Sequence, residues 1–336
     1  PSVMLKNKKL RGILQVLLSL ILLAFLLNKV GLQEVAEVLS RLNLAWYIPA
    51  FLLFLANIVI RSYRWYILYH SLNESPSFGR MVYLYFVGFF ANNFIPTGFG
   101  GDVVKVVSLR QQYGRGTDAL SSVVMDRVTG LLGSSLIALA ALAWHTIEHT
   151  QGVDLPYTIW LTIVLFSVGI PVGFLLLRWT NPFDFIKDHF PFMATMPFYN
   201  KFLELADTVK RYPWPVLLRS LVISLPFTII LILVQYCIAR ALDVPVPISI
   251  FPLYVPIIAL INLLPFTFNG LGLREGAYLF LFVPIGVAPE AAVAMSLAFY
   301  FLRFGAGLVG GLMYAWSSVS HLLRSPQADN VWKRRS

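Results

Sequence analysis

The sequence predicts an all-α polytopic membrane protein with about six full transmembrane helices and two re-entrant helical hairpins in an inverted repeat. Three observations carry this prediction: the composition, the recurrence of apolar stretches, and two matching interruptions of those stretches. Of the 336 residues, 58% are hydrophobic and only 12% are charged, whereas soluble domains carry roughly 25% charged residues. The mean hydropathy of +0.73 likewise indicates an integral membrane protein.

The apolar stretches define the expected helices in chain order. Six are expected to cross the bilayer, which takes roughly 17–25 apolar residues: 13–27, 45–69, 119–144, 156–177, 215–239 and 291–318. Three others end beside Pro, Gly or Asn and are expected to turn back inside the membrane: 81–95, 248–264 and 271–283. The polar gap at 180–214 is too short for a core of its own. We therefore expect one transmembrane domain over 1–336.

The distribution of Lys and Arg predicts the orientation, because cytoplasmic loops of membrane proteins are enriched in both. The connection 145–156 carries two acidic residues and no Lys or Arg, so it is expected outside. The basic regions are expected to be cytoplasmic: the N-terminus, 61–80, 105–115, 178–219 and 324–335. The N-terminal one precedes an apolar run without a small-residue cleavage site, which indicates a retained helix. The prediction is a plasma-membrane protein with both termini in the cytoplasm.

Two interruptions of the apolar sequence match each other in spacing. Each has an Asn and a Pro three residues apart, followed four and five residues later by small turn residues: Asn93, Pro96, Gly100 and Gly101, then Asn262, Pro265, Asn269 and Gly270. The predicted topology places both ends of 81–110 inside and both ends of 248–284 outside. We therefore expect two hairpins of opposite orientation within two repeats, 45–145 and 214–318. Unpaired backbone at such tips is tolerated only in protein or beside a wet cavity, so the tips are expected to meet in a polar site.

Charged side chains accompany both interruptions. A charge at the centre of a membrane helix costs about 2.5–3.5 kcal/mol, so such residues are functional candidates. Lys and Arg beside the free amides of half-helix N-termini favour an anion, and a phosphate carried on a lipid is the expected ligand. The candidate substrate-binding residues are Arg61, Arg64, Asn93, Gly100, Gly101, Asp102, Lys105, Asp126, Arg127, Asn269, Gly270, Arg274, Glu275 and Arg303.

Structural roles for the same residues stay open from sequence alone. Arg61 and Arg64 could snorkel to the cytoplasmic headgroups. Other charges could form buried ion pairs that hold the halves together: Asp102 with Lys105, Glu275 with Arg274 or Arg303, and Asp126 with Arg127. Four glycines in 305–311 are expected to form a helix-packing face. No cofactor or metal is expected, because the five His lack ligand spacing and Cys237 is alone.

These motifs resemble the lysylphosphatidylglycerol synthase transmembrane region, also called the UPF0104 or flippase-like family. The resemblance rests on Asn-Phe-Ile-Pro-Thr-Gly-Phe-Gly-Gly-Asp-Val-Val-Lys at 93–105, on Asp126-Arg127, and on Asn-Gly-Leu-Gly-Leu-Arg-Glu at 269–275. The chain departs from the family pattern at three positions: Lys105 stands in place of Arg, Asp126 in place of Glu, and Asn269 in place of Gly. Lys lacks the bidentate geometry of Arg toward phosphate.

The resemblance implies movement of a lipid between leaflets. Family members include proteins that move aminoacylated phosphatidylglycerol and stand-alone proteins linked to hopanoid or polyprenyl-phosphate sugar metabolism. The 336 residues contain no counterpart of the synthases' soluble aminoacyl-transferase domain, so lysine transfer to lipid is not expected.

The resulting hypothesis is a flippase for an anionic phospholipid or a polyprenyl-phosphate-linked sugar. The expected partners are membrane lipids and no nucleic acid. The sequence has no Gly-x-x-x-x-Gly-Lys-Ser/Thr loop for ATP. Two alternatives stay open: a membrane transferase that uses a lipid-phosphate donor, and a non-transporting subunit of a lipid-modifying complex. The sequence also leaves open whether the protein forms a homodimer.

Overall fold

The long helices of the computed structural model confirm a helical polytopic membrane protein. The structure describes residues 2–72, 76–95, 99–114, 116–148, 156–180, 199–262 and 270–324, and these ranges contain helices and no strand. Five helices contain apolar spans long enough to cross a bilayer: α3 (Leu44–His70), α6 (Gly116–Glu148), α7 (Tyr157–Trp179), α11 (Trp214–Ala241) and α14 (Pro289–Arg324). Each coincides with one of the apolar stretches expected to span.

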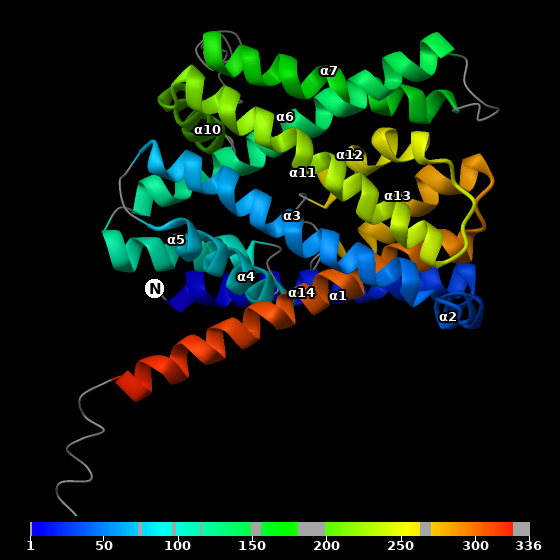
Figure 1. Cartoon of the computed structure of the whole chain (residues 1–336), viewed down its shortest axis with the longest axis horizontal. Helices are drawn as coiled ribbons and strands as arrows, with labels where there is room; N and C mark the ends of the chain where they lie inside the picture. The colour runs from blue at the N-terminus through cyan, green and yellow to red at the C-terminus, as the bar shows by residue number, and fades with distance from the viewer. Residues whose placement is uncertain are drawn as a thin grey trace, which may run out of the picture.

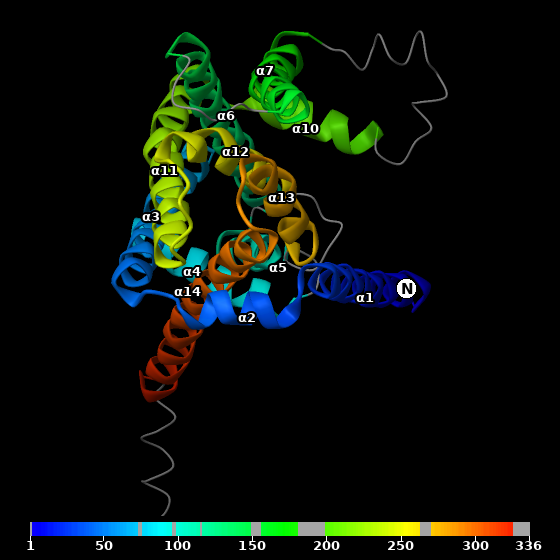
Figure 2. The same cartoon turned by 90° about the vertical axis from the view of Figure 1, so that its right-hand side faces the viewer.

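The first two helices form a bent pair. The helix α1 (Ser2–Val30) meets α2 (Leu32–Ser40) at an angle of 85°, and the pair is long and apolar enough to add a sixth span. The bend lies at Gly31, whose φ of 99° is accessible to Gly at little cost. On the core side, Val35 of α2 is buried and the helix packs on α14, whereas α1 lies at the edge of the bundle (Figure 2).

Shorter helices flank both interruptions of the apolar sequence. The first pair is α4 (Phe78–Phe94) and α5 (Gly100–Tyr113), which pack against each other. The second pair is α12 (Phe251–Ile261), preceded by η1 (Ile248–Ile250), and α13 (Leu273–Phe282), followed by η3 (Val283–Ile285). With 17 residues, α4 is the longest of the four α-helices, and at 1.5 Å per residue it measures roughly 26 Å. Pro96, Pro265 and Asn269 lie outside the described residues, so the tips themselves, the re-entrant orientation and the inverted repeat stay predictions.

Close helix crossings hold the two halves of the chain together. The helix α3 packs along α11, α4 packs along α14, and α6 contacts α11 and α12 (Figure 1). Glycine permits the α4–α14 crossing, because a Cβ on Gly310 would lie 2.0 Å from the Phe86 carbonyl oxygen. Gly307 and Gly311 face Asn93 and Phe90 of α4 in the same way. This confirms the glycines of 305–311 as a packing face.

Outside this core, α10 (Tyr199–Arg211) packs on α7 and α6. Its position is secured by Arg178, which donates hydrogen bonds to the carbonyl oxygens of Val209 and Lys210 at 3.0 and 2.6 Å.

Candidate functional site

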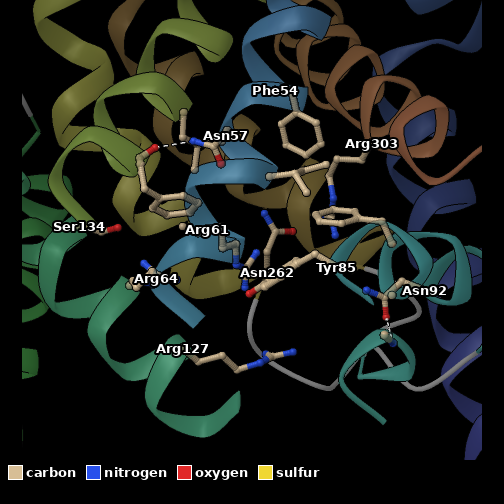
Figure 3. A pocket seen from close by; sticks show the side chains of 18 of the residues that line it. Phe54, Asn57, Arg61, Arg64, Tyr85, Asn92, Arg127, Ser134, Asn262 and Arg303 are labelled. Atoms are coloured by element: carbon tan, nitrogen blue, oxygen red, sulfur yellow. Dashed lines mark hydrogen bonds between the residues drawn. The ribbon is translucent and has the colours of Figure 1, made fainter. Parts of the chain in front are cut away.

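A cavity between the helices collects side chains from both halves of the chain (Figure 3). It is lined by residues of α3, α4, α5, α6, α11, α12 and α14. Its volume is about 190 Å³, many times the roughly 10–15 Å³ that one buried water needs. Residues next to both interruptions reach it: Asn92 and Gly101 beside the first, and Asn262 beside the second. The cavity is therefore lined by described residues that flank both interruptions.

Asp126 organises the first group of charges. Its carboxylate accepts a hydrogen bond from Arg64 Nε at 2.7 Å and a short one from the Tyr85 hydroxyl. Arg64 also donates through Nη1 to Ser224 Oγ at 3.0 Å, and its side chain is only 1% exposed. A Cβ at Gly130 would lie 3.0 Å from both terminal nitrogens of Arg64, so glycine makes room for the guanidinium. Arg64 is thus a buried ion-paired residue rather than one that snorkels to the headgroups.

Asp102 organises the second group. It accepts hydrogen bonds from Arg127, through Nε at 2.7 Å and through Nη2, and from Lys105 Nζ at 3.2 Å. The Lys105 ammonium lies 3.4 Å from the centroid of the Tyr85 ring, a cation–π contact. Tyr85 therefore joins the two groups, with its hydroxyl on Asp126 and its ring under Lys105. The expected Asp102–Lys105 pair is present, whereas Asp126 and Arg127 each pair with other residues.

Two further arginines complete the cationic lining. Arg61 Nε lies 3.6 Å from Asp126 Oδ2 and is buried without a hydrogen bond, and the side chain is 27% exposed. Arg303 enters from α14 (Figure 3), with its guanidinium carbon 6.0 Å from the centroid of the Phe299 ring. Among the described residues, five cations line the cavity: Arg61, Arg64, Lys105, Arg127 and Arg303. Asp102 and Asp126 form ion pairs with the first four of these cations, which outnumber their carboxylates by two.

The N-termini of α5 and α13 offer fewer free backbone amides than the sequence predicts. The Gly101 amide donates to Asn92 Oδ1 at 2.7 Å, and the Gly272 amide donates to Glu275 Oε2 at 2.6 Å. Both amides are thereby committed to side chains of the protein. The expectation that half-helix N-termini supply the anion contacts is wrong for these two groups.

Arg274 and Glu275 form a separate cluster that does not line the cavity. Both are fully buried, and Arg274 Nη2 donates to Glu275 Oε1 at 3.0 Å. Ser296 Oγ accepts from Arg274 Nε and donates to Glu275, both at 2.8 Å. Gly270 lies nearby with a φ of 81°, and a Cβ there would meet Asn262 Oδ1 at 2.6 Å. The geometry favours the ion-pair interpretation for this pair, although Arg274 Nη1 keeps no hydrogen-bond partner.

Two other candidates act at helix contacts. Asn93 points to α14, where its Nδ2 donates to the Phe304 carbonyl oxygen at 3.3 Å. Gly100 is buried at the start of α5, against the side chain of Ile95. Of the fourteen sequence candidates, seven line the cavity: Arg61, Arg64, Gly101, Asp102, Lys105, Arg127 and Arg303.

Several uncharged polar residues of the lining are not among the sequence candidates. Tyr85 was hidden in an aromatic-rich apolar stretch. The others carry no charge and interrupt no helix: Asn57, Asn92, Ser134 and Gln235. A usable signal was helical spacing from the charges, since Asn57 precedes Arg61 by four residues and Ser134 follows Arg127 by seven.

Comparison with known proteins shows which family the chain belongs to. The family model described as the lysylphosphatidylglycerol synthase transmembrane region matches residues 12–311. A UPF0104 membrane protein from Methanothermobacter thermautotrophicus is 24% identical over 285 residues, covering 76% of this chain and 80% of its own. UPF0104 membrane proteins from Methanocaldococcus jannaschii and Pyrococcus horikoshii are 26% and 20% identical, over 52% and 54% of this chain and 52% of each relative.

Proposed function

Because the chain belongs to the family described as the lysylphosphatidylglycerol synthase transmembrane region, we propose that it is a lipid flippase of the plasma membrane. It moves an anionic phospholipid or a polyprenyl-phosphate-linked sugar between leaflets, with both termini in the cytoplasm. The observation that carries the proposal is the cavity, in which four ion-paired cations outnumber their two carboxylates. Unbalanced buried charge is costly unless it is paired, and a phosphate of the substrate supplies the missing negative charge.

Arg61 is the residue we assign to the phosphate first. Its Nε is buried without a hydrogen bond, and its nearest carboxylate oxygen, on Asp126, is 3.6 Å away. Asp126 also accepts a hydrogen bond from Arg64 at 2.7 Å, so it still has a cationic partner when Arg61 turns to a ligand. Arg61 is therefore free to exchange a weak contact inside the protein for a charge-assisted hydrogen bond to phosphate. Transport then follows from rocking of one repeat against the other around this site.

Reconstitution tests the proposal. The purified protein is placed in liposomes with a fluorescent phosphatidylglycerol, and exchange between leaflets is followed by quenching of the outer leaflet. We expect exchange well above that of empty liposomes, and a loss of at least ten-fold in Arg61→Gln. Arg41→Gln is the matched control, since it removes the same charge from an exposed residue directly after α2 whose salt bridge is to Glu37.

Two results would contradict the proposal. One is the same exchange rate in protein-containing and empty liposomes for phosphatidylglycerol and for a polyprenyl-phosphate sugar. The other is equal activity of Arg61→Gln and Arg41→Gln. Mass analysis of the recovered lipid separates a flippase, which returns the lipid unchanged, from a transferase, which yields a new product.

A further inference from the structure

The cavity contains an uncharged polar wall beside its cations. This wall consists of Asn57 of α3, Ser134 of α6 and Gln235 of α11. Along α3, Asn57 lies seven residues from Arg64, and along α6, Ser134 lies seven residues from Arg127. At 1.5 Å per residue both separations are roughly 10 Å. A ligand whose phosphate sits among the arginines therefore extends its headgroup toward this wall.

The wall offers both acceptors and donors to a ligand. Asn57 uses its Nδ2 on the Phe227 carbonyl oxygen at 2.6 Å, which leaves its Oδ1 as an acceptor. Gln235 uses its Oε1 on the Tyr278 hydroxyl at 2.7 Å, which leaves its Nε2 as a donor. The Asn57 Oδ1 can accept a hydrogen bond from water or from a ligand that donates one, which a phosphodiester alone does not do.

Two kinds of headgroup donate hydrogen bonds, and the charge of the cavity distinguishes them. An ammonium group needs a free carboxylate, but Asp102 is held by Arg127 and Lys105, and Asp126 is held by Arg64 and Tyr85. The undescribed residues next to the interruptions, 96–98 and 263–269, contain no Asp or Glu. An ammonium would meet an excess of positive charge, whereas a hydroxyl both donates and accepts without charge.

Building on the proposed flippase function, we infer that the headgroup is a phosphate that carries an uncharged polyhydroxylated group, and not an aminoacylated one. Gln235 and Asn57 are its specificity-determining residues: they bind hydroxyls while Arg61 and its neighbours bind the phosphate. Aromatic rings of the lining, among them Phe54 and Phe227, supply the apolar surface that such pockets use beside a few placed polar groups. The hydroxylated group can come from a glycerophospholipid or from a glycosylated polyprenyl phosphate.

A panel of lipids in one liposome assay tests the inference. The hydroxylated probes are phosphatidylglycerol, phosphatidylinositol and a polyprenyl-phosphate hexose. The comparison probes are phosphatidic acid, which has a bare phosphate, and lysylphosphatidylglycerol, which adds ammonium groups. We expect at least one hydroxylated probe to exchange ten-fold faster than both comparison probes. Faster exchange of the phospholipids or of the polyprenyl lipid identifies the source of the hydroxylated group.

A pair of variants locates the effect at the wall. Tyr278→Phe removes the hydroxyl that bonds Gln235 but keeps the amide in the cavity. Adding Gln235→Leu in this background removes the amide, and no Tyr278 hydroxyl is left without its hydrogen-bond partner. Relative to Tyr278→Phe, we expect the double variant to slow the preferred hydroxylated lipid about ten-fold and to leave phosphatidic acid unchanged. The phosphatidic acid rate also reports that the double variant is folded.

The outcomes separate this inference from the function on which it rests. If no probe exchanges faster than in empty liposomes, the flippase proposal fails. If phosphatidic acid or lysylphosphatidylglycerol exchanges as fast as every hydroxylated probe, the flippase proposal stands and the headgroup inference is wrong. Equal slowing of all probes by the double variant likewise rejects a role of Gln235 in headgroup selection.

Discussion

At the scale of single residues, Arg61 and Arg64 have the same side chain but differ in burial and in contacts, which suits them to different roles. They lie three residues apart on α3 and share Asp126 as their counter-ion. Arg64 is almost fully buried and bonded to Asp126 and Ser224, whereas Arg61 has a 3.6 Å ion pair to Asp126 and cation–π contacts with Tyr85 and Phe227. The first is therefore suited to holding α3, α6 and α11 together, and the second to meeting a ligand.

This division predicts different consequences of removing each charge. Arg64→Gln leaves Asp126 without its closest cation, and breaking a buried ion pair costs about 3–5 kcal/mol. We expect a clearly lower midpoint of unfolding in detergent for Arg64→Gln, and a smaller decrease for Arg61→Gln. Thermal unfolding of both variants beside the exposed control Arg41→Gln measures this. Equal midpoints for Arg61→Gln and Arg64→Gln would show that Asp126 does not distinguish its two partners.

At the scale of elements, the crossing of α4 and α14 depends on the absence of side chains. A Cβ at Gly310 would lie 2.0 Å from the carbonyl oxygen of Phe86, which is backbone and cannot rotate away. Gly310→Ala therefore has to push the helices apart, and overpacking of this kind typically costs about 1–3 kcal/mol. Because α4 carries Tyr85 and α14 carries Arg303, we expect both thermal stability and lipid exchange to fall.

The matched control is Gly173→Ala in α7, where an added Cβ meets nothing within 4 Å. We expect that variant to unfold and to exchange lipid like the parent protein. Unchanged unfolding of Gly310→Ala would mean that α14 does not approach α4 as closely as described.

The elements also show what sequence can and cannot predict here. Long apolar runs predicted the five spanning helices. Charges within apolar sequence predicted six residues of the cavity, and the Gly pair after Pro96 predicted a seventh, Gly101. Both kinds of signal are visible in the sequence without knowledge of the packing. The pairing of the charges could not be predicted. Asp126 bonds Arg64, 62 residues away, rather than its neighbour Arg127, since adjacent residues of a helix point in different directions. Tyr85 was not predicted as a site residue, because its two contacts form only when α4 packs against α5 and α6. Its hydroxyl then donates to Asp126, and its ring contacts the Lys105 ammonium.

At the scale of the whole molecule, the predicted inverted repeat has a testable consequence for sidedness. The first short pair, α4 and α5, should have both outer ends in the cytoplasm, and the second pair, α12 and α13, should have both outside. A Cys237→Ser background removes the single native thiol. New cysteines at exposed positions then report the ends of the pairs: Gly79 and Gln112 for the first, Ser249 and Ala288 for the second.

A membrane-impermeant thiol reagent applied to intact cells should label the second set and not the first, and inverted vesicles should give the opposite result. Labelling of one member of a set from each side would mean that the corresponding pair crosses the membrane once. In that case the two interruptions would not form hairpins of opposite orientation.

The charge balance of the whole site predicts how transport responds to voltage. Asp102 and Asp126 each contact two or more cations, which favour the ionised carboxylates. Neither is suited to carrying a proton with the lipid, so the phosphate should cross with its charge uncompensated. A potential of 100 mV biases one elementary charge by about 2.3 kcal/mol, roughly fifty-fold in the leaflet ratio at equilibrium.

We therefore expect liposomes held positive inside by a potassium gradient and valinomycin to accumulate labelled phosphatidylglycerol in the inner leaflet. Zwitterionic phosphatidylcholine should not redistribute, and a pH gradient without a potential should leave phosphatidylglycerol evenly distributed. The leaflet ratio, read from quenching before and after the potential is collapsed, measures the effect. A response to the pH gradient and none to the potential would instead identify a carboxylate that carries a proton, with Asp102→Asn and Asp126→Asn showing which one.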